Sequence, residues 1–258
     1  MFSKKGHDMT TIPKRVAERF TKQVPKFRKI LNRASDKDIN EADTVTIVKD
    51  ILCDVFGYDR YDEITSEYAI RNTYCDLAVK IDDEINYLIE VKSISTDLKD
   101  SHLRQAINYG ASEGVKWVIL TNGLIWQVYN IQLKNSVEHE KVLEINFNEI
   151  SPRKKETQEL LFTLSKEGVS KDVISEYQEK INVVNRYIIS ALILSEPVVG
   201  LLRRELRKFT PGIKVENEEI EEIIRNEIFK RNVLEDEKAI NAQKRVKRYL
   251  SSLNKTKK

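Results

Sequence analysis

The chain has 258 residues, of which 33% are charged and 40% hydrophobic, and its formal net charge at pH 7 is +3. This composition is typical of a globular protein with room for one large domain, or for one domain with a helical appendix. Two cysteines and three histidines argue against a disulfide framework and against a histidine-rich metal site. No apolar run approaches the roughly 18 residues of a membrane span, and the N-terminus lacks the apolar segment of a secretory signal. We therefore expect a cytoplasmic protein with no membrane partner.

The charge is unevenly distributed along the chain. Asp and Glu outnumber Lys and Arg in residues 41–150, whereas Lys and Arg are in excess on both sides of this segment. An acidic middle suits a cation site, and basic flanks can supply contacts to nucleic-acid phosphates. The alternative is that the basic runs are solvated helix faces, and the pattern alone does not choose between the two.

The first elements are expected to be helical. Residues 1–38 are predicted to form a basic arm with a short amphipathic helix over residues 14–31, broken at Pro25. Asn40 is a good N-cap for the next helix, and Glu41 lies in its first turn, where the helix dipole by itself favours a carboxylate. The helix has an apolar stripe at helical spacing, formed by Val45, Val48, Leu52, Val55 and Phe56.

A hairpin with its turn at residues 82–84 carries the residues around which we expect the chemistry. Its first strand alternates and sets Asp76 on one face. The second strand, residues 85–92, is apolar enough to be central in a sheet. It ends in Glu90 and Lys92, which point to the same side because the side-chain period of a strand is two. If the strands pair around this turn, Asp76 lies opposite a position near Glu90.

Two carboxylates and one ammonium then share a small space. Close carboxylates repel each other, and a divalent cation such as Mg²⁺ relieves that repulsion and can activate a water beside a phosphate. Lys92 is then able to orient or deprotonate the water, or to offset charge on a phosphoryl group. The alternative is a cross-strand salt bridge at a sheet edge, which the short motif by itself favours.

More strands and one helix follow the hairpin. The stretch 93–97 is expected to be a loop, followed by a helix over residues 98–113 on which Gln105 and Tyr109 share a face. Further strands are predicted over residues 116–121, 124–129 and 142–147.

From residue 151 onward the periodicity is helical, so we expect a domain boundary near that position. The predicted helices cover residues 152–166, 170–194, 197–208, 216–231 and 236–252. Clustered cations make two stretches candidates for nucleic-acid binding, with exposed helix ends as an equally good alternative. These candidates are Lys14 and Arg15 near the N-terminus and Lys244, Arg245, Lys247 and Arg248 in the last helix.

Together the motifs resemble the PD-(D/E)XK nuclease superfamily, and more closely the N-terminal nuclease domain of the restriction subunit of type I restriction enzymes. Asp76 is followed after thirteen residues by Glu90-Val91-Lys92, and then by Gln105-x-x-x-Tyr109 on the next helix. The phrase Asn40-Glu41-Ala42-Asp43 before an apolar helix is also similar. The resemblance covers about residues 38–150.

The resemblance implies an α/β fold, a restriction-endonuclease-like mixed sheet flanked by helices. It implies Mg²⁺, with Mn²⁺ as a substitute, held by Asp76, Glu90 and the carbonyl oxygen of Val91, with Lys92 as the catalytic lysine. Glu41 would complete the acidic cluster, to which Glu67 is a further candidate, and Gln105 and Tyr109 would position the metal site or the DNA backbone. No phosphate-binding loop of the Gly-x-x-x-x-Gly-Lys-Ser/Thr type is present, so an ATP-driven motor in this chain is excluded.

The leading interpretation is a Mg²⁺-dependent DNA endonuclease of a restriction or phage-defence system. Its domains are predicted as a basic arm (1–38), a nuclease-like domain (39–150) and an all-helical C-terminal domain (151–258). The alternatives are a non-catalytic nucleic-acid-binding module with the same fold, or an interaction subunit of a larger assembly. Whether the chain pairs with itself or with a partner subunit stays open at this point.

Overall fold

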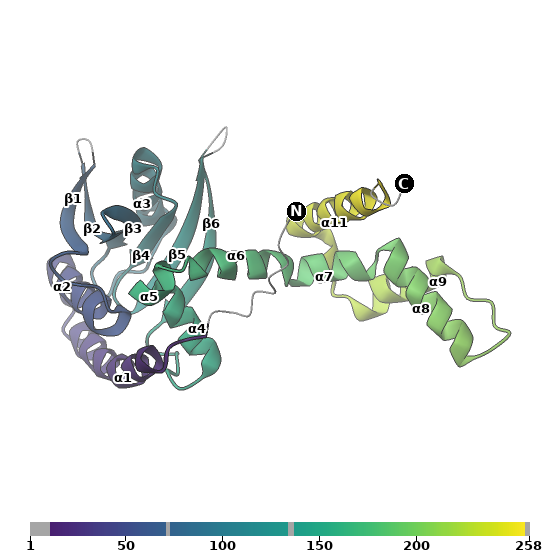
Figure 1. The fold of residues 1–258 in the computed structure, drawn as a ribbon, viewed down its shortest axis with the longest axis horizontal. Helices are drawn as coiled ribbons and strands as arrows, with labels where there is room; N and C mark the ends of the chain where they lie inside the picture. Colours follow the sequence, from purple (N-terminus) through teal and green to yellow (C-terminus); the bar gives the residue numbers. More distant parts are fainter. Residues whose placement is uncertain (1–10, 71–72, 134–136, 256–258) are drawn as a thin grey trace. The chain divides into compact units, whose positions relative to one another are not determined.

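The α/β architecture predicted from the sequence is confirmed in the computed structural model. It describes residues 11–70, 73–133 and 137–255, and the chain forms two compact units, residues 1–177 and 178–258 (Figure 1). The first unit contains a six-stranded mixed sheet flanked by helices, and the second unit is helical. Within the described part of the chain, none of the helices has the length and apolar character of a membrane span.

The strands of the first unit are β1 (Ile64–Ile70), β2 (Thr73–Ile81), β3 (Glu84–Val91), β4 (Trp117–Thr121), β5 (Ile125–Leu133) and β6 (Val137–Asn146). Its helices are α1 (Lys14–Asp36), α2 (Glu41–Ile51), the π-helical η1 (Leu52–Phe56), α3 (Asp100–Glu113), α4 (Lys155–Leu164) and α5 (Lys166–Val169). The helix α6 (Val173–Val183) contains the boundary between the units. The second unit consists of α7 (Arg186–Ile193), α8 (Glu196–Phe209), α9 (Asn217–Ile223), η2 (Ile224–Ile228), α10 (Arg231–Glu235) and α11 (Glu237–Lys255).

The six strands lie in the sheet in the order in which they occur along the chain. All neighbouring strands are antiparallel except β3 and β4, which are parallel. A parallel pair needs a crossover connection, and α3 supplies it. Consequently α3 begins on the side of the sheet at which β3 has its C-terminal end. β3 itself is a central strand, with β2 and β4 as its neighbours.

Both faces of the sheet are covered. On one face Leu88 and Val118 pack against Leu103 and Ile107 of α3. On the other face the ring of Trp126 meets that of Phe56 edge-on, with 5.4 Å between the centroids. The covered faces explain why β3 is buried from Tyr87 to Val91.

The expectation that Pro25 breaks the first helix is wrong, because α1 runs unbroken through it. The missing proline N–H costs one hydrogen bond, but a continuous buried stripe holds the helix against the first unit. This stripe consists of Val16, Phe20, Val24, Phe27, Leu31 and Ala34. From residue 11 onward, the predicted arm is therefore packed against the first unit. Residues 1–10 of the predicted arm lie outside the residues that the structure describes.

The helical segment that follows the sheet begins within the first unit. The hydroxyl of Tyr58 donates to the carbonyl oxygen of Leu164 at 2.8 Å, and that of Tyr87 donates to the carbonyl oxygen of Thr163 at 3.2 Å. These contacts hold the end of α4 against the sheet unit. The boundary between the compact units accordingly lies at residues 177 and 178, beyond the change of pattern at residue 151.

Two predicted element lengths differ from those observed. The hairpin of β5 and β6 is longer than predicted. The outer part of β6 is exposed and charged and so lacks an apolar alternation, whereas β5 continues through the buried Asn130 and Ile131. The predicted helix 170–194 is divided into α6 and α7. Asn185 causes this division, since its side chain accepts hydrogen bonds from the N–H groups of Tyr187 and Ile188 and caps α7.

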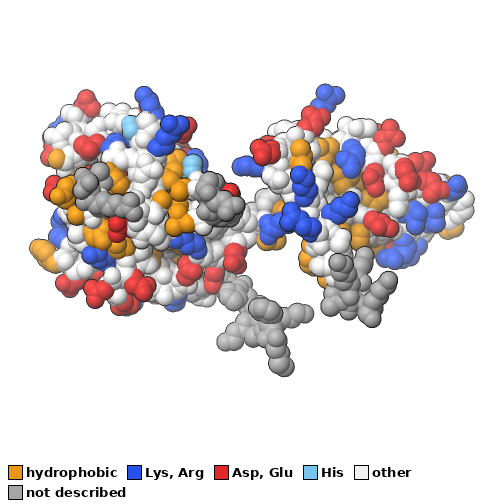
Figure 2. Space-filling view, turned by 90° about the horizontal axis from the view of Figure 1, so that it is seen from above, with side chains coloured by type: hydrophobic (Ala, Val, Ile, Leu, Met, Phe, Trp, Pro, Cys, Tyr) orange, Lys and Arg blue, Asp and Glu red, His pale blue; other side chains and the backbone are white. Residues whose placement is uncertain are grey.

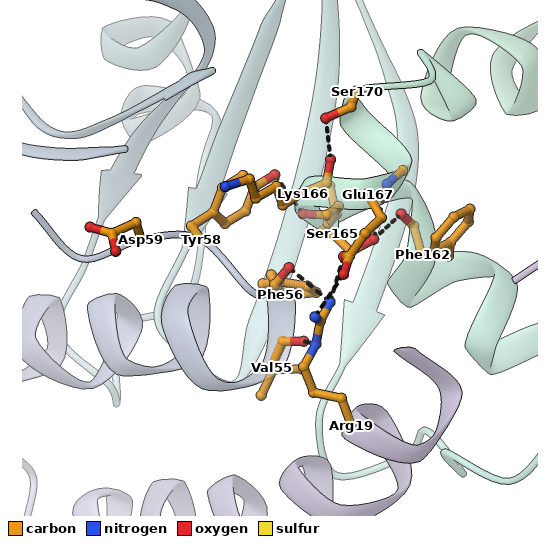
Figure 3. A network of polar contacts seen from close by, with 12 residues as sticks. Arg19, Val55, Phe56, Tyr58, Asp59, Phe162, Ser165, Lys166, Glu167 and Ser170 are labelled. Atoms are coloured by element: carbon orange, nitrogen blue, oxygen red, sulfur yellow. Dashed lines mark hydrogen bonds and ion pairs between the residues drawn. The ribbon is translucent and has the colours of Figure 1, made fainter. Parts of the chain in front are cut away.

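Arg19 on α1 connects three segments of the first unit (Figure 3). Its Nε donates to the carbonyl oxygen of Val55 at 2.9 Å, and its Nη2 to that of Phe56 at 3.1 Å. Both carboxylate oxygens of Glu167 accept from the same guanidinium, at 3.0 and 2.7 Å. Gly57 has a φ of +87°, and a Cβ there would lie 2.5 Å from Arg19 Nη1, so both the backbone and the close approach require glycine.

Replacing Arg19 by Met is expected to lower the free energy of unfolding by about 2–3 kcal/mol, because it removes the guanidinium donors of a half-buried carboxylate and of two carbonyl oxygens. Burial acts to raise the pKa of Glu167, but the hydrogen bonds and charge of Arg19 outweigh it and hold that pKa below its usual value. The stabilisation is thus present above the ordinary carboxyl range and lost as the pH falls. Urea unfolding at neutral and acidic pH should show the difference between wild type and Arg19→Met shrinking in acid.

The matched control is Lys26→Met, which removes the more exposed ion pair with Asp54. It should change the stability by less than about 1 kcal/mol. Equal losses in the two variants would contradict a special role for Arg19.

Candidate active site

The register of the β2–β3 hairpin brings Asp76 to the end of β3. Leu77 pairs with Ile89, so continuing the pairing by one residue sets Asp76 opposite Glu90, as predicted. The Oδ2 of Asp76 accepts a hydrogen bond from the backbone N–H of Val91 at 2.7 Å. The Asp76 carboxylate therefore lies directly against the backbone of the Glu-x-Lys motif.

Glu90 is a buried carboxylate on a central strand. The residue is 2% exposed, and its Oε1 accepts a hydrogen bond from Lys92 Nζ at 2.7 Å. Its Oε2 is buried and has no hydrogen-bond partner among the described residues. Burial first, and then the charges of Asp76 and Glu41, raise the pKa of Glu90 to about 7 against the opposing effect of Lys92. The salt bridge of the alternative interpretation is present, between Glu90 and Lys92, but it lies at the end of a central strand and not at a sheet edge.

The ammonium of Lys92 lies between two carboxylates. It is 2.7 Å from Oε1 of Glu90 and 3.5 Å from Oε2 of Glu41, and only 14% of the lysine side chain is exposed. Burial by itself lowers the pKa of Lys92, but pairing with these carboxylates outweighs burial and raises it. The backbone N–H of Lys92 donates to the carbonyl oxygen of Thr121 at 2.8 Å. Sequence reasoning missed Thr121, because no local pattern identifies a parallel partner strand.

The acidic surroundings of Asp76 come from three elements. Burial raises the pKa of Asp76, and the charges of Glu41 on α2 and Glu67 on β1 act in the same direction, while Val91 N–H and Lys92 oppose them. Glu67 has a left-handed φ of +49° within its strand. A non-glycine residue in this region is strained, and such strain is common at functional sites. The structure thus brings Glu41 and Glu67 within electrostatic reach of Asp76.

Gln105 and Tyr109 share one face of α3, as their spacing predicted. The Nε2 of Gln105 donates to the Tyr109 hydroxyl at 2.8 Å, and Tyr109 is buried in the core between α3 and the sheet. Within the described residues no hydrogen bond joins this pair to Asp76 or Glu90. Their contact with a metal site or with DNA stays a prediction.

The donors at this site fit a small divalent cation. Mg²⁺ is usually held by one or two carboxylates, with waters and substrate phosphates completing the octahedron. Asp76 and Glu90 supply two carboxylates, and the buried Oε2 of Glu90 lacks a partner. The described residues contain no group of three or more His, Cys, Asp or Glu side chains that could hold a metal ion, and Glu41 is instead paired with Lys92. The ligand roles of Glu41 and of the Val91 carbonyl oxygen stay predictions.

The basic residues of the last predicted helix lie on α11. Lys244, Lys247 and Arg248 line a surface hollow of about 510 Å³ together with two serines. Figure 2 shows Lys and Arg side chains gathered on the second unit. Arg245 differs from the other three, because its Nη1 donates to the carbonyl oxygen of Asn182 at 2.9 Å and so holds α11 against the end of α6.

The basic residues singled out near the N-terminus lie on the first turn of α1. Lys14 forms an exposed ion pair with Glu18 at 3.8 Å. Arg15 lines a surface hollow together with Lys166 and Lys171. Both cations therefore remain available at the surface of the first unit.

Replacing Glu90 by Gln is expected to raise the free energy of unfolding by about 1–2 kcal/mol at pH 8 without divalent cations, because it removes a buried charge that repels Asp76 and Glu41. Lys92→Met should instead lower it by about 2 kcal/mol, since Glu90 then loses its donor. Urea unfolding measures both effects, and Glu84→Gln at the exposed start of β3 is the matched control. A loss of stability in Glu90→Gln equal to that in Lys92→Met would mean that the carboxylate serves the fold.

Comparison with known families gives one match. The model of the type I restriction enzyme R protein N terminus matches residues 47–145, a span that contains Asp76, Glu90 and Lys92 but not Glu41. No curated protein and no solved structure matches the chain. The resemblance predicted from the motifs is confirmed for residues 47–145, which are similar to the N-terminal domain of the type I restriction enzyme R protein.

Proposed function

We propose that this protein is a Mg²⁺-dependent endonuclease that hydrolyses phosphodiester bonds in DNA, in a restriction or phage-defence system. The observation that carries the proposal is the buried Glu90, opposite Asp76 and beside the ammonium of Lys92, with one oxygen that lacks a partner among the residues described. The family match of the same segment supports a nuclease-related role.

Each residue of the site has a role in this proposal. Asp76 and Glu90, with the carbonyl oxygen of Val91, would hold Mg²⁺ or Mn²⁺. The bound ion would activate a water and offset charge on the phosphate. Glu41 keeps the Lys92 ammonium near this cluster through their 3.5 Å contact.

Lys92 acts best as a charged donor. Its raised pKa keeps the ammonium protonated at neutral pH, so it can donate a hydrogen bond to a phosphoryl oxygen as negative charge grows there. Deprotonating the water would first require the ammonium to lose a proton while it still faces Glu90. Orientation and charge stabilisation are therefore the roles that this geometry supports.

Gln105 has spare hydrogen-bonding capacity. One of its amide protons is used by Tyr109, which leaves the second proton and the carbonyl oxygen available. The side chain is exposed in the first half of α3, the helix that follows β3 in the chain. We assign Gln105 to the DNA backbone and Tyr109 to holding it in position.

A second candidate function is a nucleic-acid-binding module without turnover. It is favoured by one observation, that the Lys92 ammonium already pairs with an oxygen of Glu90 and one of Glu41. A divalent cation would have to compete with this pairing. Divalent-ion-dependent cutting separates the two functions.

We expect the purified chain to cut plasmid DNA with Mg²⁺ or Mn²⁺ and not with EDTA. Lys92→Ala should reduce the rate by at least about 100-fold, because it removes a charge that stabilises the transition state. Asp76→Asn should reduce it similarly and also weaken Mg²⁺ binding in calorimetry, because it removes a charged oxygen ligand.

The matched controls for this experiment are Lys141→Ala on β6 and Glu84→Gln on β3, which should cut at the wild-type rate. Cutting by Lys92→Ala at the wild-type rate would contradict the assignment of Lys92 as the catalytic lysine. DNA binding by wild type without any cutting would favour the non-catalytic module.

DNA must be held mainly outside the acidic segment around the site. Triple replacement of Lys244, Lys247 and Arg248 by Ala, with Arg245 kept for its structural contact, should weaken duplex binding. The slope of log K against log salt should become shallower by roughly 0.9 for each phosphate that the variant no longer neutralises. Lys14→Ala/Arg15→Ala tests the first unit in the same way, and fluorescence anisotropy of a labelled duplex measures both.

The control for charge alone replaces three exposed lysines of the first unit, Lys37, Lys141 and Lys154, by Ala. Identical slopes in all variants and wild type would mean that both basic regions are solvated surface.

A further inference from the structure

The helices α7 and α11 lie side by side in the second unit (Figure 1). Their starts are joined, because the hydroxyl of Tyr187 on α7 donates to Oδ2 of Asp236, just before α11, at 2.9 Å. Further along, Ala191 of α7 is buried in one cluster with Val246 of α11. α7 has eight residues and α11 has nineteen, so α11 extends beyond the end of α7.

A hollow of about 430 Å³ lies where α7 ends and α11 continues. Its volume falls within the roughly 300–1,000 Å³ that is usual for small-molecule sites. Apolar side chains from the end of α7 and from α11 form part of its wall, among them Leu194, Val246 and Leu250. Polar side chains form the rest, among them Glu196, Arg225, Gln243 and Lys247. We refer to this site as the α7–α11 hollow.

Several polar groups of the α7–α11 hollow are available to a ligand. The side chains of Gln243 and Lys247 make no hydrogen bond or ion pair with any residue that the structure describes. Arg225 has only an exposed ion pair with Glu221, at 3.9 Å. An amide such as that of Gln243 both donates and accepts hydrogen bonds, and the two cations only donate. The hollow therefore suits a ligand with a polar edge and a negative charge.

The basic surface of α11 begins at the same hollow. Lys247 and Ser251 line both the α7–α11 hollow and the hollow of about 510 Å³ that Lys244 and Arg248 also line. These four residues are separated by steps of one, three and four and so lie along one face of α11. In the part of the chain that is described, Lys244 and Arg248 have no ion pair. A ligand body in the α7–α11 hollow thus has several cations beside it for an attached anionic group.

We propose that the α7–α11 hollow binds the base of an unpaired nucleotide, whose phosphate lies on Lys247 and the neighbouring cations of α11. Proteins bind unpaired bases by packing side chains against the flat faces and by hydrogen-bonding the polar edge. Leu194 and Leu250 provide the packing, and the Gln243 amide matches an edge that both donates and accepts. The carboxylate of Glu196 accepts from an amino group of the base.

The nucleotide has two sources with the same chemistry, a free nucleoside phosphate or an unpaired position in a DNA strand. For the DNA strand, the inference rests on the proposed function. Duplex DNA reaches the cations of α11 with its phosphates, but its paired bases cannot enter the hollow. The hollow would therefore distinguish unpaired from paired DNA.

Other ligands fit the α7–α11 hollow less well. A bare anion leaves the apolar wall around Leu250 unfilled and is repelled by Glu196. A wholly apolar ligand would remove water from Gln243 and Lys247 without offering them a partner, which costs free energy. An unpaired nucleotide provides apolar faces, a polar edge and a phosphate together.

The first test is calorimetry of the full chain with each deoxynucleoside monophosphate, with inorganic phosphate as the reference. EDTA is present throughout, so that binding through a metal ion at Asp76 does not contribute. At least one of the nucleotides should bind tenfold more tightly than inorganic phosphate. Gln243→Leu should weaken that nucleotide about tenfold, because it removes hydrogen bonds to the base, and should leave the affinity for inorganic phosphate unchanged. The matched control is Asn241→Leu, an exposed position of α11 that lines neither hollow.

The second test compares a labelled single strand with a duplex of the same length by fluorescence anisotropy. Ser251→Trp fills the hollow and keeps every cation, with Asn241→Trp as its control, and circular dichroism checks the helix content of both variants. If the source is a DNA strand, the single strand binds wild type more tightly than the duplex, and Ser251→Trp removes this difference. If the source is a free nucleotide, Ser251→Trp abolishes mononucleotide binding and the single strand does not compete for it.

Two results would overturn the proposal. In the first, no mononucleotide binds better than inorganic phosphate and the single strand binds no better than the duplex. In the second, Gln243→Leu and Ser251→Trp both leave nucleotide binding at the wild-type level. Neither test requires cutting, so a chain that fails to cut DNA would contradict the proposed function and leave this result unaffected.

Discussion

The burial of Glu90 at the end of a central strand is the constraint on which the candidate site depends. β3 has β2 on one side and β4 on the other, and the parallel pairing with β4 requires the crossover helix α3. These elements remove water from Glu90, so its charge must be balanced within the protein. Lys92 does this for one oxygen, and the other has no hydrogen-bond partner in the described part of the chain. A buried, half-satisfied carboxylate is costly for stability, which points to a role in chemistry.

The helices on the face of the sheet that α3 does not cover offset the cost in stability of burying Glu90. α1 contributes a continuous apolar stripe, and Arg19 joins it to η1 and α5. Trp126 and Phe56 fill the layer between the sheet and η1. Unfavourable charge is thus concentrated where β3 ends, around Glu90 and Asp76, while the remaining packing supports that part of the sheet.

The acidic and the basic surfaces lie in different units of the chain. The first unit contains the acidic cluster, whose negative charge suits a cation and opposes DNA. The second unit contains the basic surface of α11, lined by Lys244, Lys247 and Arg248.

The sequence by itself determined the features that depend on chain neighbours. Alternation and the turn at residues 82–84 set Asp76 opposite Glu90, and the period of two sets Glu90 and Lys92 on one side. Only the tertiary structure decided that α1 continues through Pro25 and that α4 belongs to the sheet unit. It also decided that Glu41 contacts the Lys92 ammonium and that the carbonyl oxygen of Thr121 accepts from the Lys92 backbone N–H. The reason is physical: periodicity is read from adjacent residues, whereas burial, parallel pairing and helix packing arise between segments far apart in the sequence.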